Sequence, residues 1–548
     1  MNVISASIVA ATLLGTSGCG GFKARAKHET APLLEGLGDH HFEITTSEKM
    51  AQRFFDQGLI LYYGFNHLEA KRSFAEAARI DPECAMCPWG VALTLGTNIN
   101  ARMEAADVPE AFAAAQKALT LALGASPREQ ALIQALATRY EAHARDDRSQ
   151  LDKAYSIAMR DVAQRFGNDP DVLTLYAESL MDLSPWDYWL PNNEPKPTTT
   201  EILATLESAI AVNPKHPGAN HLYIHAVETG RPEAGVGAAE RLATVVPGAG
   251  HLVHMPSHIY IRVGRYHDGS LANERAIAAD RSYITQCRQQ GLYPLAYVPH
   301  NVHFLWACET LEGRSADAIE TAYQLNREVD TKVMRQPGYG TLQHFWITPL
   351  YALVRFGKWD EVLAYDEPEA DLVYPRGVWH YARTLAHARK GNLDAAAADL
   401  ERLWALADDP ALEAITIWDI NGTAALLGIA RYVAAGELAA ARGDHTRAVE
   451  HLRQATALED ALNYDEPSSW HAPVRHTLGA VLLQTGDADA AEAAYREDLN
   501  TFPNNGWALR GLQQSLRAQG KNAEAEALKP QLTTAWKYAD IQLSASRY

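Results

Sequence analysis

Small and large side chains recur at matching offsets in two widely separated stretches, and this repeat restricts the fold more than any other feature. The pattern is helix-length apolar runs punctuated by Gly, Asn or Asp, with almost no β-branched alternation. In such a repeat the small residues let two helices approach closely, and an aromatic residue fills the gap beside them. The residues concerned are Phe54, Gly58, Leu61, Ala70, Phe74, Ala77 and Pro82, and then Leu478, Gly479, Leu482, Gly486, Ala491, Tyr495 and Pro503.

Turns and helix starts support the same interpretation. Gly391-Asn392-Leu393 and Gly443-Asp444-His445 have the form of a turn between paired helices. Thr45-Thr46-Ser47-Glu48 and Ser126-Pro127-Arg128-Glu129 each have the spacing of a capping box, in which a hydroxyl and a glutamate satisfy the first backbone N–H groups of a helix. We therefore expect an all-α chain of helix pairs.

This pattern resembles the tetratricopeptide repeat family, over nearly everything after residue 47. The resemblance implies an α-solenoid, a right-handed superhelix of helix pairs whose first helices line a concave groove. It also implies a role in binding a peptide or a protein partner in that groove. We expect one array over residues 47–310 and a second over residues 311–548.

Composition excludes several classes of protein. The 548 residues carry a formal net charge of −18 and are 47% hydrophobic, which excludes wholesale disorder. An acidic chain is a poor partner for nucleic acid, because phosphate binding needs clustered Lys and Arg. No run of eighteen apolar residues occurs, so we expect contact with a membrane only through a lipid anchor.

The N-terminus has the features of an export signal. An apolar run from Ile4 to Leu14 is followed by small residues and Cys19, which resembles the lipobox of bacterial lipoproteins. No Lys or Arg precedes the run, and Thr16 stands where leucine is usual, so an uncleaved tail is the alternative. We expect a signal over residues 1–19, a tether over 20–46, lipidation of Cys19 and a location in the cell envelope or periplasm.

Histidines are concentrated in one part of the chain. Nine of the 21 lie between His216 and His303. His221 and His225 are four residues apart, and so are His254 and His258, a spacing that places two imidazoles on one helix face within reach of one metal ion. Each pair also lies seven and eleven residues after a proline, which indicates equivalent positions on successive helices.

Two further pairs accompany these histidines. Glu178 and Asp182 are four residues apart on the preceding helix, and His300 and His303 are three apart on the following one. Imidazoles and carboxylates that converge form a ligand set for copper, zinc or iron, with room for one or two ions. Alternatively, the histidines cap helices, pack as structural groups or bind an acidic peptide. Glu228 is a further ligand or base, or else a surface glutamate near a helix end.

Cys84 and Cys87 begin a predicted helix. Pro88 follows them, so they do not form a c-type haem attachment sequence. A disulfide is expected in an oxidising compartment, with copper(I) binding and free thiols as alternatives. The Trp186, Tyr188 and Trp189 cluster is expected to form a packed loop or a lid.

The sequence therefore predicts an envelope-located repeat protein that binds one or two transition-metal ions in its groove. It does not decide between a metalloenzyme and a metal store or carrier. In a hydrolytic enzyme Glu178 or Asp182 would act as the base for a metal-bound water. The alternative function is a scaffold that binds a peptide or an assembly partner in the groove without metal.

Overall fold

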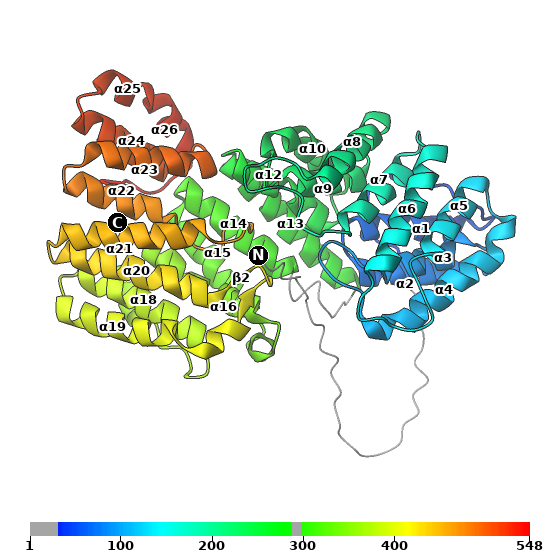
Figure 1. Cartoon of the computed structure of the whole chain (residues 1–548), viewed down its shortest axis with the longest axis horizontal. Helices are drawn as coiled ribbons and strands as arrows, with labels where there is room; N and C mark the ends of the chain where they lie inside the picture. The colour runs from blue at the N-terminus through cyan, green and yellow to red at the C-terminus, as the bar shows by residue number, and fades with distance from the viewer. Residues whose placement is uncertain (1–30, 288–296) are drawn as a thin grey trace, which may run out of the picture. The chain divides into compact units, whose positions relative to one another are not determined.

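The computed structural model describes residues 31–287 and 297–548, and these residues form helices joined by short connections, with one small two-stranded hairpin (Figure 1). They divide into two compact units. The N-terminal unit comprises described residues 31–256 and 278–287, and the C-terminal unit comprises 257–277 and 297–548. Each unit is described by itself.

The first helices are α1 Lys49–Tyr63, α2 His67–Ile80, α3 Met86–Thr94, η1 Ala105–Asp107, α4 Val108–Leu121, η2 Ala122–Gly124, α5 Pro127–Ala137, α6 Ser149–Arg165, α7 Pro170–Met181, α8 Pro197–Val212, α9 Pro217–Val227, α10 Pro232–Val245, α11 Gly250–His254, α12 Pro256–Arg262 and α13 Tyr266–Cys287. The chain passes between the units within α12 and α13. The later elements are α14 Val298–Glu312, α15 Ser315–Glu328, η4 Val333–Arg335, α16 Gly340–Arg355, α17 Trp359–Ala364, α18 Val373–Arg389, α19 Leu393–Ala407, η5 Pro410–Ala414, β1 Thr416–Ile417, β2 Asn421–Gly422, α20 Thr423–Ala441, α21 His445–Asp460, α22 Val474–Gln484, α23 Ala488–Thr501, α24 Gly506–Ala518, α25 Asn522–Ala527 and α26 Lys529–Ala535.

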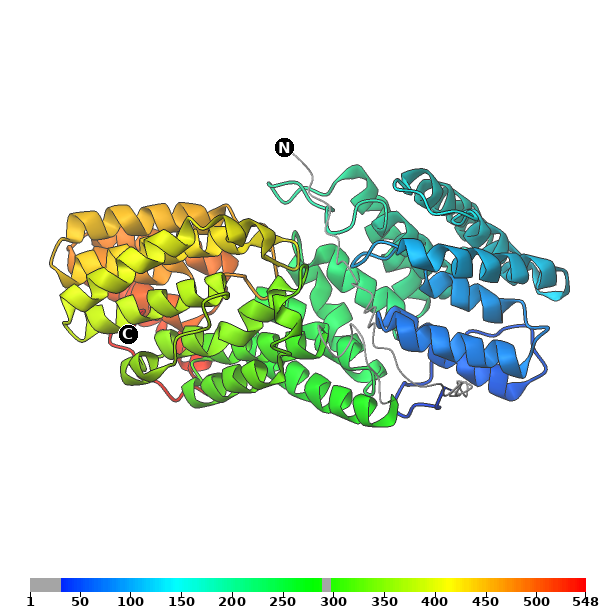
Figure 2. The ribbon, with the colours of Figure 1, turned by 90° about the horizontal axis from the view of Figure 1, so that it is seen from below.

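Consecutive helices pack against each other as pairs, which confirms the predicted all-α fold of tetratricopeptide-like hairpins. In the N-terminal unit α1 packs on α2, and α7 packs on α8. In the C-terminal unit α18 packs on both α19 and α20, and α20 packs on α21. Figures 1 and 2 both show these four helices, coloured yellow-green to gold, lying side by side.

The repeat residues have the packing role that their spacing predicts. A Cβ added at Gly58 of α1 would lie 2.8 Å from the ring of Phe74 of α2, and one added at Gly479 of α22 would clash with the ring of Tyr495 of α23. Both aromatic rings are fully buried. Any side chain at these glycines would therefore force the paired helices apart.

One of the two predicted capping boxes is present. Ser126 accepts a hydrogen bond from the backbone N–H of Glu129, whose carboxylate accepts one from the N–H of Ser126, and α5 begins at the next residue. The box expected at Thr45 is absent, because α1 begins at Lys49 without a side-chain cap. Thr45 instead donates its backbone N–H to Glu129 at 2.7 Å.

The segment expected as a tether is folded over residues 31–46. Phe42 and Ile44 are buried, and the backbone N–H of Leu34 donates to Gln57 of α1 at 2.8 Å. Apolar side chains and backbone groups of this segment thus have partners on the N-terminal unit, which a free tether would lack. Residues 1–30, with the proposed signal and Cys19, lie outside the described residues.

The division between the units differs from the expected one. Residue 310, the expected boundary, lies inside α14, which packs on α15 in the C-terminal unit. The observed division falls after Pro256 within α12, and residues 278–287 of α13 return to the N-terminal unit.

One described helix, α20, is long and apolar enough to cross a membrane by length and composition. Of the most apolar 18-residue stretch of α20, 56% is buried inside the structure. The helix packs against α18, α19 and α21. These features are those of a core helix in the C-terminal unit.

Candidate metal centre

Three buried histidines of the N-terminal unit come together at one point. His221 and His225 lie one turn apart on α9, and His251 lies on α11. Each offers a ring nitrogen, and the three nitrogens lie within 4.8 Å of one another. The i, i+4 spacing predicts the first two, whereas it assigns no role to His251. The sequence feature that could have indicated His251 is its position three residues before His254, which places both on one helical turn.

Hydrogen bonds fix the orientation of two of these rings. Nδ1 of His221 donates to the backbone carbonyl of Tyr63 at 2.5 Å, and Nδ1 of His225 donates to Oε1 of Glu228 at 2.9 Å. Because a carbonyl and a carboxylate only accept, the proton of each neutral ring is on Nδ1, and Nε2 keeps a lone pair. This is the arrangement that protein metal sites use to orient histidine ligands.

The separation between two of the rings suits a shared ion. Nε2 of His221 lies 3.2 Å from Nε2 of His251. Two nitrogens bound to one zinc ion at the tetrahedral angle lie about 3.3 Å apart, given bonds of about 2.0–2.1 Å. The same separation also permits a hydrogen bond between the two rings without an ion.

Two aromatic residues with left-handed backbone enclose these histidines. The ring centroid of Phe65 lies 4.5 Å from that of His221, 5.8 Å from His225 and 5.4 Å from His251, and Trp186 meets His225 edge-on at 5.0 Å. Phe65 has a φ of +56° and Trp186 a φ of +63°. A side chain in this region costs about 1–2 kcal/mol, so the surrounding structure must hold both residues there.

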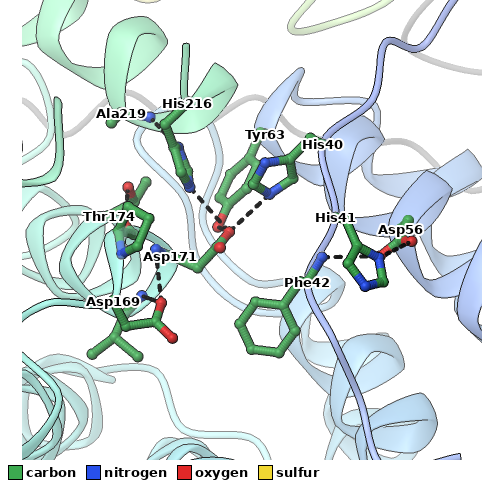
Figure 3. A network of polar contacts seen from close by, with 12 residues as sticks. His40, His41, Phe42, Asp56, Tyr63, Asp169, Asp171, Thr174, His216 and Ala219 are labelled. Carbon is green, nitrogen blue, oxygen red and sulfur yellow. Dashed lines mark hydrogen bonds and ion pairs between the residues drawn. The ribbon is translucent and has the colours of Figure 1, made fainter. Parts of the chain in front are cut away.

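A second cluster in the same unit is centred on Asp171 (Figure 3). Oδ1 of Asp171 accepts from Tyr63 Oη at 2.8 Å, from His40 Nε2 at 2.9 Å and from His216 Nε2 at 3.0 Å. Burial alone would raise the pKa of Asp171, but its interactions with His216 and His40 hold that pKa well below its usual range. No sequence spacing predicted this cluster, because its members come from four distant segments.

The hydrogen bonds of His216 make the second cluster a poor metal site. Its Nδ1 accepts from the backbone N–H of Ala219 at 3.0 Å and so caps α9, while its Nε2 donates to Asp171. Coordination through Nε2 would require the proton to move to Nδ1 and the cap to break. The Asp171 cluster is therefore a network of hydrogen bonds, although its ligand types resemble those of a metal centre.

Glu178 and Asp182 are directed to other partners than the three histidines. Tyr62 Oη donates to Oε2 of Glu178 at 2.8 Å, and Arg139 Nη2 donates to Oδ2 of Asp182 at 2.8 Å. Burial and the neighbouring Asp182 raise the pKa of Glu178, and burial also raises the pKa of Asp182, against the effect of Arg139. Among the described residues, no group suited to a metal ion includes either carboxylate.

The remaining predicted ligands are distributed over both units. His254, in the N-terminal unit, has its ring centroid 5.9 Å from that of His251. The ring centroids of His258 and His300, in the C-terminal unit, lie 5.9 Å apart. His303 in the same unit stacks on Trp306 and contacts the His344 ring. His254 is the last residue of α11, and His258 lies on α12, which begins at Pro256. A second ion at these residues stays a prediction.

The structure also describes the cysteine pair, the segment around Trp186 and Glu228. Cys84 and Cys87 form a disulfide at the start of α3, and both residues are buried. The segment around Trp186 is a loop between α7 and α8 that covers His225. Glu228 is fully buried and holds His225, so its interpretation as a surface glutamate was wrong.

No family model and no curated protein sequence matches the chain. Among solved structures, the human IFIT1 dimer with PPP-AAAA is 12% identical over 89% of this chain and 91% of that one, with a TM-score of 0.30. Yeast Tom70 is 11% identical over 90% and 100%, with a TM-score of 0.32. The Cut9–Hcn1 hetero-tetramer of APC/C is 13% identical over 90% and 76%, with a TM-score of 0.28. Such loose superpositions carry no argument about function, and the fold assignment rests on the helix pairs of this chain.

Proposed function

We propose that the N-terminal unit binds one transition-metal ion through His221, His225 and His251. The observation that supports this most is the pair of Nδ1 hydrogen bonds, to the Tyr63 carbonyl and to Glu228, which place the proton of each ring on Nδ1 and its lone pair on Nε2. Carbonyl and carboxylate partners of this kind also make the imidazole a stronger ligand.

Three neutral imidazoles suit zinc, copper or iron. With zinc, three histidines leave a fourth position for water or another ligand, as in catalytic zinc sites. A metalloenzyme and a metal carrier would both use this arrangement. We therefore propose that the unit binds the ion, without a choice between these two functions.

The alternative function is a scaffold whose groove histidines contact a peptide. His221, His225 and His251 are each less than 5% exposed. A peptide on the surface of the unit would not reach these rings without a rearrangement of Phe65 and Trp186. Their burial favours the ion, which is small enough to be enclosed. Partner binding elsewhere on the helix pairs is compatible with a metal centre.

Equilibrium dialysis of untagged protein against Zn²⁺ tests the proposal. We expect one tightly bound ion per chain in the wild type, and at least a tenfold weaker affinity in His225→Gln, since a three-ligand site would lose one ligand. His143→Gln is the matched control, because His143 is an exposed histidine of the same unit, and it should bind as the wild type does. Equal uptake by wild type and His225→Gln would place the ion elsewhere.

A further inference from the structure

Tyr63, the last residue of α1, connects the two histidine clusters of the N-terminal unit. Its hydroxyl donates to Oδ1 of Asp171 at 2.8 Å, and its backbone carbonyl accepts from Nδ1 of His221 at 2.5 Å. Figure 3 shows the hydroxyl side of this residue beside His40 and His216. One residue thus belongs both to the Asp171 network and to the support of a proposed metal ligand.

The position of Tyr63 is fixed from two sides. A Cβ added at Gly218 of α9 would lie 2.5 Å from the Tyr63 ring, so the ring packs directly on the backbone of the helix that carries His221. On the other side the hydroxyl is held by Asp171 of α7. A shift of the ring would therefore move the end of α1, where the carbonyl that holds His221 lies.

Asp171 is in turn held by the segment that precedes α1. His40 of that segment donates Nε2 to Oδ1 of Asp171 at 2.9 Å, and both side chains are buried. The His40 ring also packs on Tyr63 and on His216, with centroids 5.9 Å and 4.8 Å away. His41, the next residue, is largely exposed and bonds Asp56 instead.

We propose that His40 is a positioning residue for the metal centre. Through Asp171 and Tyr63 it fixes the carbonyl that orients His221, so docking of residues 31–46 and binding of the ion stabilise each other. This inference rests on the proposed function. It adds that the metal centre is incomplete without the segment before the first helix.

The coupling makes two measurable predictions. His40→Ala and Tyr63→Phe should each weaken Zn²⁺ binding about tenfold, the lower end of the effect of residues that support metal ligands. His40→Gln keeps an N–H donor at similar reach and should restore most of the affinity. His41→Ala removes a neighbouring histidine of the same segment and should leave the affinity unchanged.

The second prediction concerns the wild-type chain alone. Because coupling between two equilibria is reciprocal, Zn²⁺ should slow amide hydrogen exchange in residues 31–46. This measurement needs no substitution, so it stays decisive even where His40→Ala fails to fold by circular dichroism.

The possible outcomes separate the two proposals. Stoichiometric Zn²⁺ binding by the wild type, with equal affinity in folded His40→Ala and no change in exchange over residues 31–46, would overturn the inference and leave the metal centre standing. Absence of Zn²⁺ binding by the wild type would overturn the proposed function itself, and the inference with it. Weaker binding in His40→Ala, rescue by His40→Gln and slower exchange with Zn²⁺ support the coupling.

Discussion

Nε2 of His251 lies 3.2 Å from Nε2 of His221, and the Nδ1 proton of His221 is held by a backbone carbonyl. Without an ion, the neutral His221 ring can only accept at Nε2, so His251 must donate. With an ion, both nitrogens present lone pairs to it. The geometry therefore permits a neutral resting state that exchanges one interimidazole hydrogen bond for two metal bonds, at the cost of a tautomer change at His251.

The role of Glu228 can be tested by removing its charge. Glu228→Gln keeps an acceptor for Nδ1 of His225 but loses the carboxylate that strengthens the ligand. We expect Zn²⁺ affinity to fall by about 10–100-fold, measured by competition with a chelator. Glu233→Gln, at an exposed position of α10, is the control and should have no effect. Unchanged affinity in Glu228→Gln would mean that the carboxylate does not support the ligand.

The buried carboxylates Glu178 and Asp182 should make the free energy of unfolding depend on pH. Burial raises both pKa values, so the folded chain keeps protons that the unfolded chain releases above about pH 4. Stability from this pair is therefore present at acidic pH and falls as pH rises through neutrality, with a slope of up to about 1.4 kcal/mol per pH unit for each retained proton.

Glu178→Gln should flatten that slope, because a neutral amide takes the place of a group that must ionise. Urea denaturation between acidic and weakly basic pH measures it, and Glu194→Gln, on the exposed loop before α8, serves as the control. An identical pH profile in Glu178→Gln and wild type would show that the carboxylate does not retain its proton on folding.

The left-handed backbone at Phe65 should give its variants an unusual order of stability. Phe65→Ala should destabilise the chain by about 3–5 kcal/mol, because the buried ring packs on three histidines. Phe65→Gly should be the more stable of the two by about 0.5–1 kcal/mol, since the left-handed backbone favours glycine by more than glycine loses in chain entropy. Thermal unfolding monitored by circular dichroism ranks the two variants, and the usual order, with alanine more stable, would contradict the strain at this position.

The location in the cell envelope is a proposal that rests on Cys19. Cys19→Ala should release the protein from the membrane fraction and leave its helical content unchanged, because the described helices all lie at residue 49 or later. Cell fractionation followed by circular dichroism of the soluble protein measures both. A wild-type protein that is soluble with residues 1–18 intact would exclude lipidation.

The sequence predicted the fold and part of the site for clear physical reasons. The close approach of paired helices leaves a local pattern, such as Gly58 with Phe74, and chelation by one helix leaves the i, i+4 spacing of His221 and His225. His251 comes from another helix, so its pairing with His221 depends on packing. The link from His40 through Asp171 to Tyr63 joins distant segments, and no local spacing encodes it.

Burial was the property that the sequence predicted least well. Glu178 and Asp182 have the spacing of a second ligand pair, but Arg139 and Tyr62 occupy them. The segment around Phe42 has an irregular and polar sequence, yet Leu37, Phe42 and Ile44 are buried and the backbone N–H of Phe42 donates to Asp56. Both differences arise from contacts across the fold.

X-ray absorption at the metal edge of stoichiometrically loaded, untagged protein tests the metal centre most directly, because it reports the ligands of the ion itself. We predict a first shell of nitrogen or oxygen at about 2.0–2.1 Å with the multiple-scattering signature of three imidazoles, and of two imidazoles in His225→Gln. No stoichiometric uptake of zinc, copper or iron by the wild type, or a loaded ion without imidazole scattering, would contradict the assignment of His221, His225 and His251 as a metal centre.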